Sequence, residues 1–212
     1  MSTLIIWDFD GTLADSRPWI YASYRYAARE SGLPEPTDEQ LSHHCCGGIF
    51  DNLEVLFGKT GEEAEAMAAL YRKYYAENCM DKVCLFDGIR EVVFTLKERG
   101  YAQAVATMKI QPVAQELIDN LGIGECFVKV AGTALDRKVT KTQMILDCKS
   151  AGDYDRVVMI GDCPTDMHAA KNAGAEFIAV AFGYGFPEER CISEGIDYVN
   201  SPEDIIRQLS RE

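Results

Sequence analysis

Five short segments of the chain are mostly apolar and rich in strand-forming residues, without a strict alternation of apolar and polar positions. They cover residues 4–9, 102–107, 127–132, 156–161 and 176–182. Near-continuous apolar character is typical of strands that are buried on both faces of a sheet. The pattern therefore predicts a central β-sheet that is covered by helices on both sides.

Between these segments the apolar residues change to a helical spacing. In residues 88–100, Ile89 and Val92 begin one apolar stripe, and residues 111–122 and 140–152 follow the same pattern. Strands that alternate with helices are typical of a parallel sheet with right-handed crossovers. The chain is therefore predicted to adopt an α/β fold with a central parallel sheet.

Residues 16–82 depart from this alternation, because they contain no convincing strand and two capping boxes, which begin at Thr37 and Thr60. We expect a small helical domain inserted after the first strand, with residues 1–15 and 83–212 forming the core domain. The alternative is that these helices only cover one face of the sheet.

Composition limits the classes of partner. The 212 residues are 47% hydrophobic and 26% charged, which is typical of a globular protein, and the formal net charge is −13. Nucleic-acid backbones and anionic membranes attract surfaces rich in Lys and Arg, so we expect no nucleic acid and no membrane as a partner. An anionic substrate would need a local positive charge, such as a metal ion or a lysine.

The eight cysteines are irregularly spaced and form no C-x-x-C pair. Residues 1–3 lack the basic stretch of a secretion signal, and the apolar segments are too short to cross a membrane. We therefore expect a cytoplasmic protein with reduced thiols.

Two acidic residues follow the first predicted strand. Asp8 and Asp10 are two positions apart, so their side chains point to the same side of an extended chain, and Gly11 permits a sharp turn. Thr12 can tie this turn through its hydroxyl. The alternative is an Asp-rich turn that is stabilised by its own hydrogen bonds. In open parallel sheets, however, ligands bind where the strands end, which favours a functional site.

A second acidic pair, Asp162 and Asp166, follows the predicted strand at residues 156–161. Asp162 could be a helix N-cap, but capping hardly explains both acids. Thr107 ends another strand, and Lys141 begins a helix, where a cation is disfavoured by the helix dipole. We expect all of these side chains to meet in one crevice.

Four motifs then carry a resemblance to a known family: DFDGTLADS (8–16), VATMK (105–109), TKTQMI (140–145) and GDCPTDMHAAKNAG (161–174). In these segments, and over nearly its whole length, the chain resembles the haloacid dehalogenase-like (HAD) hydrolase superfamily. It is most similar to the helical-cap subgroup that includes phosphoglycolate phosphatase and β-phosphoglucomutase. The resemblance implies a Rossmann-like three-layer core with a helical cap.

The resemblance also implies roles for the acidic residues. Asp8 is the expected nucleophile, and Asp10 the expected acid and base. The cofactor is expected to be Mg²⁺, held by Asp8, the Asp10 backbone carbonyl and Asp162, with Asp166 in support.

The phosphoryl oxygens would be bound by Thr107, Lys141 and the backbone N–H groups at Phe9 and Asp10. Lys138 is the alternative lysine, but it falls in a polar connection, whereas Lys141 has the apolar spacing of a helix beside it.

The implied function is Mg²⁺-dependent hydrolysis of small phosphate monoesters through an aspartyl-phosphate intermediate. An Asp at position 10 favours phosphate-ester chemistry, because a leaving halide needs no proton. Met108 stands where relatives often carry Asn, which puts the usual substrates in doubt. The alternatives are a phosphomutase of the β-phosphoglucomutase type and a non-catalytic binding module. The expected partner is a small phosphorylated metabolite, and the expected state is a monomer or homodimer.

Substrate specificity is expected to come from the cap. Gly48 belongs to a Gly-Gly pair that can form a loop, and Ile49, Phe50 and Asn52 are candidates to touch the leaving group. A simple helix–helix turn is the alternative. The neighbouring segment 43–46, HHCC, is not expected to bind metal, because four adjacent ligands cannot close one tetrahedron without strain.

Overall fold

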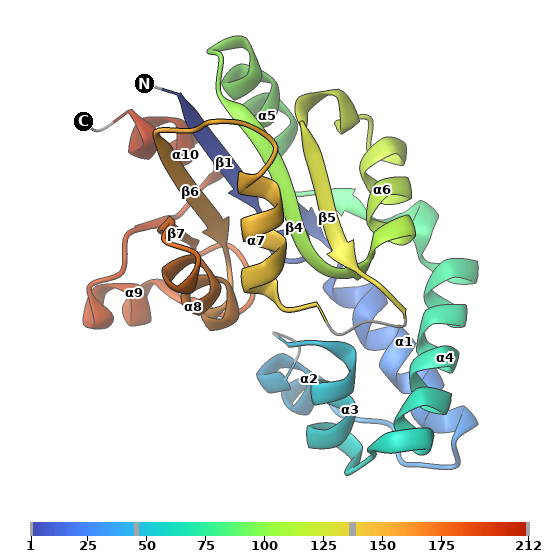
Figure 1. The fold of residues 1–212 in the computed structure, drawn as a ribbon. Coiled ribbons are helices and arrows are strands. Elements are labelled where there is room, and N and C mark those ends of the chain that lie inside the picture. Colours follow the sequence, from blue (N-terminus) through green and yellow to red (C-terminus); the bar gives the residue numbers. More distant parts are fainter. Residues whose placement is uncertain (1, 45–46, 136–138, 211–212) are drawn as a thin grey trace. The chain divides into compact units, whose positions relative to one another are not determined.

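The computed structural model describes residues 2–44, 47–135 and 139–210 (Figure 1). By its contacts the chain divides into two units. We call Met1–Asp15 together with Cys84–Glu212 the core unit, and Ser16–Val83 the helical unit.

The core unit contains a six-stranded sheet in which all neighbouring strands are parallel, in the order β5-β4-β1-β6-β7-β8. The strands are β1 (Thr3–Trp7), β4 (Ala102–Ile110), β5 (Lys129–Thr133), β6 (Arg156–Gly161), β7 (Glu176–Val180) and β8 (Tyr198–Val199). The predicted parallel sheet is confirmed, and its five predicted strands are present. The sixth strand, β8, was not predicted, because two residues are too few to give a pattern.

Strand β1 occupies the middle of the sheet. Its Ile5 lies opposite Gln103 of β4 on one side and Val158 of β6 on the other. All five residues of β1 are buried, which explains its continuous apolar character. The carboxyl end of β1 therefore lies at the centre of the sheet's carboxyl edge, between the ends of β4 and β6.

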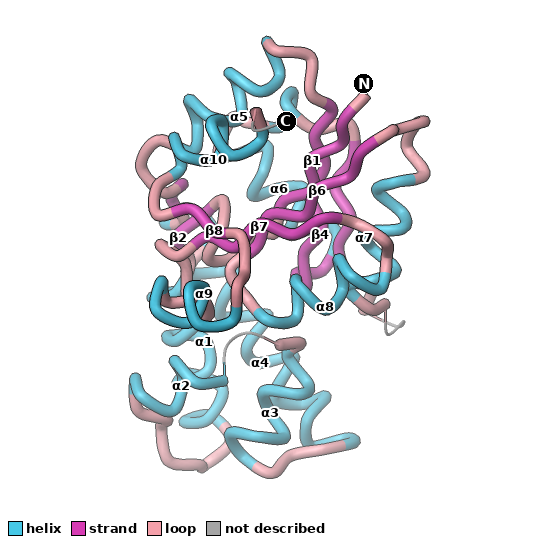
Figure 2. Tube along the Cα trace, turned by 90° about the vertical axis from the view of Figure 1, so that its left-hand side faces the viewer, coloured by secondary structure: helices cyan, strands magenta, loops and turns pink. Residues whose placement is uncertain are grey.

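Helices cover both faces of this sheet (Figure 2). On one face, Met144 and Ile145 of α7 and Ala169 of α8 pack against Leu4 and Ile6. Helices α5 and α10 lie together on the other face (Figure 2). The helices of the core unit are α5 (Ile89–Glu98), α6 (Gln111–Asn120), α7 (Lys141–Lys149), α8 (Pro164–Asn172), α9 (Glu188–Glu194) and α10 (Pro202–Leu209), with a short 3₁₀ turn at Gly124–Cys126. The Rossmann-like three-layer arrangement is confirmed.

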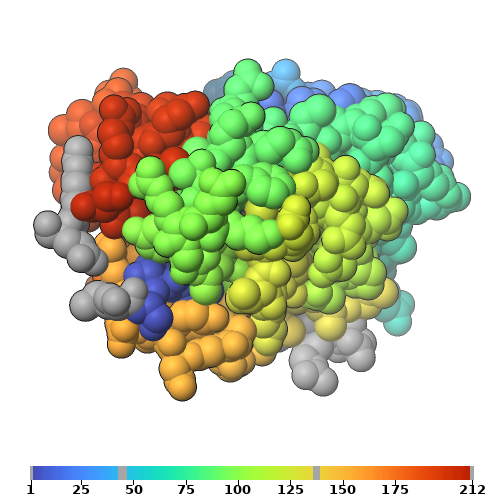
Figure 3. All heavy atoms as spheres, turned by 90° about the horizontal axis from the view of Figure 1, so that it is seen from above, coloured from blue at the N-terminus to red at the C-terminus, as the bar shows by residue number. Residues whose placement is uncertain are grey.

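At the amino ends of the strands, the beginning of the chain is hydrogen-bonded to the loop before β6. The Ser2 N–H donates to Asp155 Oδ2 at 2.7 Å, and Ser2 Oγ donates to the Asp153 carbonyl at 3.0 Å. Figure 3 shows this blue segment between the orange residues before β6 and the green residues of α5.

The chain leaves and re-enters the core unit through a small antiparallel ribbon. Strands β2 (Ala14–Asp15) and β3 (Cys84–Leu85) pair with each other, Asp15 lying opposite Cys84. These four residues directly flank the helical unit in the sequence.

In its described residues, the helical unit consists of helices alone: α1 (Arg17–Glu30), α2 (Asp38–His44), α3 (Ile49–Phe57), α4 (Gly61–Asn78) and a 3₁₀ turn at Met80–Lys82. Helices α1 and α4 pack through tyrosines: the rings of Tyr24 and Tyr71 are 4.7 Å apart, and those of Tyr26 and Tyr74 are 4.6 Å apart. Aromatic pairs at such distances stabilise the packing beyond the area that they bury.

The two predicted capping boxes differ. The box at Thr37 is confirmed, because the Gln40 N–H donates to Thr37 Oγ1 at 3.2 Å and the Thr37 N–H donates to Gln40 Oε1 at 2.9 Å. The box at Thr60 is wrong: Thr60 is the N-cap of α4 but makes no side-chain cap bond. The Glu63 carboxylate instead accepts a bond from Lys59 at 2.6 Å.

Five cysteines of the described chain are free thiols: Cys79, Cys84, Cys126, Cys148 and Cys191. Cys163 is disulfide-bonded, so the prediction of reduced thiols is wrong at this residue. Within the described residues, no helix combines the length and the apolar character that a membrane span requires.

Candidate active site

A tight turn follows β1 and carries the first acidic pair. Asp8 is still part of the sheet, because its N–H donates to the Ile160 carbonyl of β6 at 2.9 Å. The Phe9 carbonyl then accepts bonds from the N–H groups of Leu13 and Ala14, both at 3.0 Å. Asp8 is therefore held by the strand itself, and Asp10 by the turn.

Gly11 is required in this turn for two reasons. Its φ of +79° lies in the left-handed region that other residues rarely adopt, and a Cβ atom would come within 2.2 Å of Asp162 Oδ2. The prediction that Thr12 ties the turn through its hydroxyl is wrong. Among the described atoms, Thr12 Oγ1 is buried and has no hydrogen-bond partner, because backbone groups already close the turn.

Lys141 joins two of the predicted acids. Its Nζ lies 2.6 Å from Asp8 Oδ1 and 2.9 Å from Asp166 Oδ1, and its side chain is 8% exposed. The first turn of α7 is fixed by Thr140, whose Oγ1 accepts a bond from the Gln143 N–H at 3.2 Å. The two carboxylates explain why a lysine stands at a helix start in spite of the dipole.

Asp162 follows β6 and is fully buried. Its Oδ2 accepts a bond from the Tyr184 N–H at 2.8 Å, but its Oδ1 has no hydrogen-bond partner within the described structure. Gly183 allows the loop after β7 to close over this residue, because a Cβ there would lie 2.3 Å from Asp162 Cβ. A buried carboxylate oxygen without a partner is costly, so its presence points to a ligand that the polypeptide does not supply.

Asp166 completes the acidic group from the first turn of α8. Its Oδ2 accepts a bond from the Cys163 N–H at 3.1 Å, which caps the helix and fixes the carboxylate. Candidate ligand oxygens of Asp162 and Asp166 lie within 4.8 Å of each other. Gly161 provides the space, since a Cβ there would lie 2.5 Å from Asp166 Oδ2.

Burial and mutual repulsion perturb Asp8 and Asp162. The pKa of Asp8 is raised to about 7, first by burial and then by the neighbouring Asp166, and Lys141 offsets part of this rise. The pKa of Asp162 is raised well above its usual range, first by burial and then by Asp8 and Asp166. Burial alone would lower the pKa of Lys141, but Asp166 and Asp8 raise it above its usual value.

Three buried carboxyl groups thus surround one buried ammonium group. If all three were ionised, negative charge would be in excess, and Asp162 Oδ1 has no hydrogen-bond partner in the described structure. A hard divalent cation, which prefers oxygen ligands, fits this donor set.

The end of β4 supplies the predicted hydroxyl. Thr107 is fully buried, and its Oγ1 accepts a bond from the Lys109 N–H at 3.3 Å. Met108, between them, is 38% exposed. Lys109, the last residue of the VATMK motif, was not predicted to belong to the site. Lys109 Nζ lies 3.0 Å from Asp10 Oδ1.

Tyr184 is a second residue that was not predicted to belong to the site. Besides the backbone bond to Asp162, its hydroxyl donates to Asp15 Oδ1 at 3.0 Å. It therefore connects the end of β6 with the ribbon strand β2. The two glycines that flank it, Gly183 and Gly185, were the only available signal of a functional turn.

The four cap candidates lie in the helical unit. Gly48 is the N-cap of α3, and Ile49 and Phe50 are in its first turn. The Phe50 ring lies 5.6 Å from the Arg72 guanidinium. Asn52 is buried, and its Nδ2 donates to the Tyr24 hydroxyl at 2.9 Å, so its amide stabilises the packing of the helical unit itself. Lys138 and the side chains of segment 43–46 lie outside the described residues.

The sequence profile of the haloacid dehalogenase-like hydrolases matches residues 5–180. The chain therefore belongs to this hydrolase family, as its motifs indicate.

Three known proteins illustrate the relationship. The chain is 31% identical to the tyrosine-protein kinase PtkA of Mycobacterium tuberculosis over 86% of its own length, but it spans only 63% of that relative. It is 29% identical to the N-acetylmuramic acid 6-phosphate phosphatase of Pseudomonas aeruginosa, over 98% of the chain and 94% of the relative. A haloacid dehalogenase-like hydrolase from Streptococcus pneumoniae shares the fold, with a TM-score of 0.88, 23% identity and 99% of each chain covered.

Proposed function

We propose that the protein is a Mg²⁺-dependent phosphatase that hydrolyses small phosphate monoesters through an aspartyl-phosphate intermediate. The observation that carries this proposal is the pairing of Asp8 with Lys141 beside Asp162, whose Oδ1 has no partner in the described structure. Such an arrangement combines a nucleophile, a fixed positive charge and a place for a cation. Relatives that are named as phosphatases support the same reaction class.

In the first step, an Asp8 carboxylate oxygen attacks phosphorus and the bond from phosphorus to the ester oxygen breaks. Asp10, two residues further along the same turn, donates its proton to the departing alkoxide. Lys141 and the Thr107 hydroxyl bind the phosphoryl oxygens, so that charge on the transferred group is neutralised.

In the second step, Asp10 accepts a proton from water, and the resulting hydroxide attacks phosphorus. The bond between phosphorus and the Asp8 oxygen breaks, which releases inorganic phosphate and restores the carboxylate. The contact between Lys141 and Asp8, at 2.6 Å, keeps the nucleophile in place through both steps.

The residues that would hold Mg²⁺ are Asp8, Asp162 and the Asp10 backbone carbonyl, with Asp166 beside them. When bound, the ion would neutralise phosphoryl oxygens as a Lewis acid. Two features support this assignment: Asp162 Oδ1 has no hydrogen-bond partner among the described residues, and the buried carboxyl groups outnumber the buried ammonium group.

The helical unit is proposed to act as the cap that selects the substrate. Gly48, Ile49 and Phe50 remain the candidates for contact with the leaving group, whereas Asn52 serves the internal packing. The substrate is proposed to be a small phosphorylated metabolite, since Lys141 together with a bound divalent cation would offset the charge of a monoester dianion.

A phosphate-release screen tests the proposal. The purified protein is incubated with a panel of phosphorylated metabolites, with Mg²⁺ and with EDTA, beside the variants Asp8→Asn and Asp153→Asn. Asp153 is an exposed residue before β6, so its variant is a matched control for the same chemical change. We expect Mg²⁺-dependent release that only Asp8→Asn abolishes. Interconversion of sugar phosphates without net release of phosphate would instead identify a phosphomutase. No activity on any substrate would contradict an enzymatic role.

A further inference from the structure

Strand β4 contains an irregularity at its carboxyl end. Ala106 pairs with Ala131 of β5 and Ile110 pairs with Thr133, so four steps along β4 correspond to two steps along β5. Residues 107–109 therefore form a bulge opposite Gly132. Bulges near strand ends change the direction of side chains and are frequent beside functional sites.

Several contacts show that this bulge is a defined conformation. Gln111 Nε2 donates to the Val130 carbonyl at 2.9 Å, and the Gly132 N–H donates to Gln111 Oε1 at 2.6 Å. The side-chain amide thus replaces backbone bonds that the bulge removes from the ladder. Gly132 is needed because a Cβ there would lie 2.7 Å from the Lys109 carbonyl.

The bulge brings Lys109 to the turn after β1. Its side chain is 9% exposed, and its Nζ lies 3.0 Å from Asp10 Oδ1 and 5.6 Å from the centre of the Phe9 ring. The ring below and the carboxylate beside it leave the ammonium little freedom to move.

The same residue also orients Thr107. Because the Lys109 N–H donates to Thr107 Oγ1, the hydroxyl oxygen is an acceptor in this bond, and its own proton remains free for a different acceptor. Lys109 thus contacts two predicted site residues, one through its backbone and one through its side chain.

From this geometry we propose that Lys109 is a positioning residue, which holds the Asp10 carboxylate in the orientation needed for proton transfer to the leaving group. The proposal rests on the proposed phosphatase function and assigns different roles to two lysines. Lys141 holds the nucleophile Asp8 and the neighbouring Asp166, whereas Lys109 holds the proton carrier Asp10.

The dependence on the leaving group tests this role. p-Nitrophenolate leaves without a proton, whereas an alkoxide must receive one from Asp10. We therefore expect Lys109→Met to lower kcat for an alkyl phosphate by about 10-fold or more, and kcat for p-nitrophenyl phosphate by less than about 3-fold. Lys109→Arg, which keeps the charge, should recover part of the alkyl-phosphate activity.

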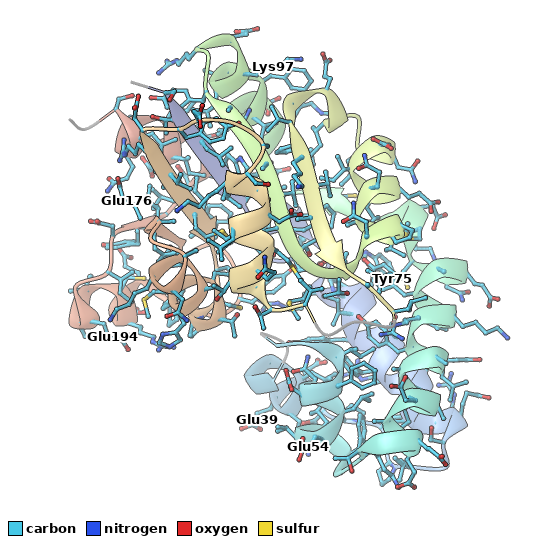
Figure 4. All side chains as sticks on the ribbon, viewed as in Figure 1. Glu39, Glu54, Tyr75, Lys97, Glu176 and Glu194 are labelled. Carbon is cyan, nitrogen blue, oxygen red and sulfur yellow. The ribbon has the colours of Figure 1, made fainter. Side chains whose placement is uncertain are left out.

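The control is Lys97→Met, the same substitution at an exposed lysine at the opposite end of the sheet (Figure 4). It should change neither rate. If Lys109→Met fails to fold, as judged by circular dichroism, Lys109→Gln provides the uncharged variant.

A double-mutant cycle makes the test specific for Asp10. In an Asp10→Asn background, Lys109→Met should change the remaining alkyl-phosphate activity by less than about 2-fold, because the group that Lys109 holds no longer transfers a proton. Equal losses on both substrates, or additive losses in the cycle, would overturn the role of Lys109 while leaving the phosphatase function intact. A wild-type protein without activity on either ester would overturn both.

Discussion

The core unit and the helical unit differ in the charge and the hydrogen bonding of their buried polar groups. In the described helical unit, the buried polar side chains are uncharged, and both Ser23 and Asn52 have hydrogen-bond partners within the unit. The core unit buries charged groups at the ends of β1 and β6, and its Asp162 Oδ1 has no partner in the described structure. Ser23 and Asn52 are thus bonded within the helical unit, whereas Asp162 of the core unit keeps an oxygen that a ligand can use.

This difference separates groups that stabilise the fold from groups that serve chemistry. Buried polar groups with partners lower the free energy of the folded state, whereas repelling carboxylates raise it and persist where they have a function. Substitutions in each unit test whether its buried polar groups stabilise the fold or serve chemistry.

The largest expected effect belongs to Asp8→Asn. It should lower phosphate release at least about 1000-fold, because the proposed nucleophile is lost. In EDTA, however, the variant should be as stable as the wild type or more stable. Since burial raises the folded-state pKa of Asp8 from 3.8 to about 7, its ionisation destabilises the fold increasingly as pH rises between these values.

Urea unfolding of wild type and variant in EDTA at several pH values checks this account. The stability advantage of Asp8→Asn should grow from pH 4 to about pH 7 and then level off. A variant that is clearly less stable than the wild type at neutral pH would show that Asp8 is a stabilising residue.

Lys141→Met should have the next largest effect. It leaves Asp8 and Asp166 without their buried cation and should lower the free energy of unfolding by about 3 kcal/mol, together with loss of activity. Lys97→Met, which removes an exposed pair with Glu125, should leave thermal unfolding unchanged. Equal melting temperatures for the two variants would contradict the importance of the buried pair.

A smaller effect is expected in the helical unit. Tyr24→Phe removes the hydroxyl that accepts the Asn52 bond and should cost about 1 kcal/mol of unfolding free energy. Mg²⁺ affinity, measured by calorimetry, should not change, because every residue of the proposed metal site belongs to the core unit. A loss of Mg²⁺ binding in this variant would remove the distinction between the two units.

The smallest effect concerns two cysteines of the core unit. Burial raises the pKa of the Cys148 thiol to about 12, and its Sγ contacts the Val105 carbonyl at 3.5 Å, whereas Cys84 is exposed. Only thiolates react with iodoacetamide, so at pH 8 the folded protein should be alkylated at Cys84 and not at Cys148. Mass spectrometry with and without urea gives the comparison, and rapid labelling of Cys148 in the native state would contradict its burial.

The parts of the site that could be predicted lie on single strands. Asp8, Thr107 and Asp162 follow apolar segments directly, so the end of each strand and the residue type were visible together. That Lys141 reaches the same place as the acids was also indicated, because a lysine at a helix start needs an explanation, but its pairing with two carboxylates was not predicted.

The parts that were missed depend on contacts between distant segments. Lys109 reaches Asp10 because β4 bulges against β5, and a bulge leaves no clear periodicity in the sequence. Tyr184 holds Asp162 through its backbone N–H, which any non-proline residue could supply, so its side chain carried no signal for this role. The ribbon strand β2 is too short to be recognised from a pattern.

The most direct test of the central claim is a calorimetric titration of Mg²⁺ into the wild-type protein and into Asp162→Asn. The account predicts binding to the wild type and loss of binding in the variant, because the unpartnered oxygen of Asp162 belongs to the metal site. Equal Mg²⁺ binding by both proteins, or no binding by the wild type, would contradict it.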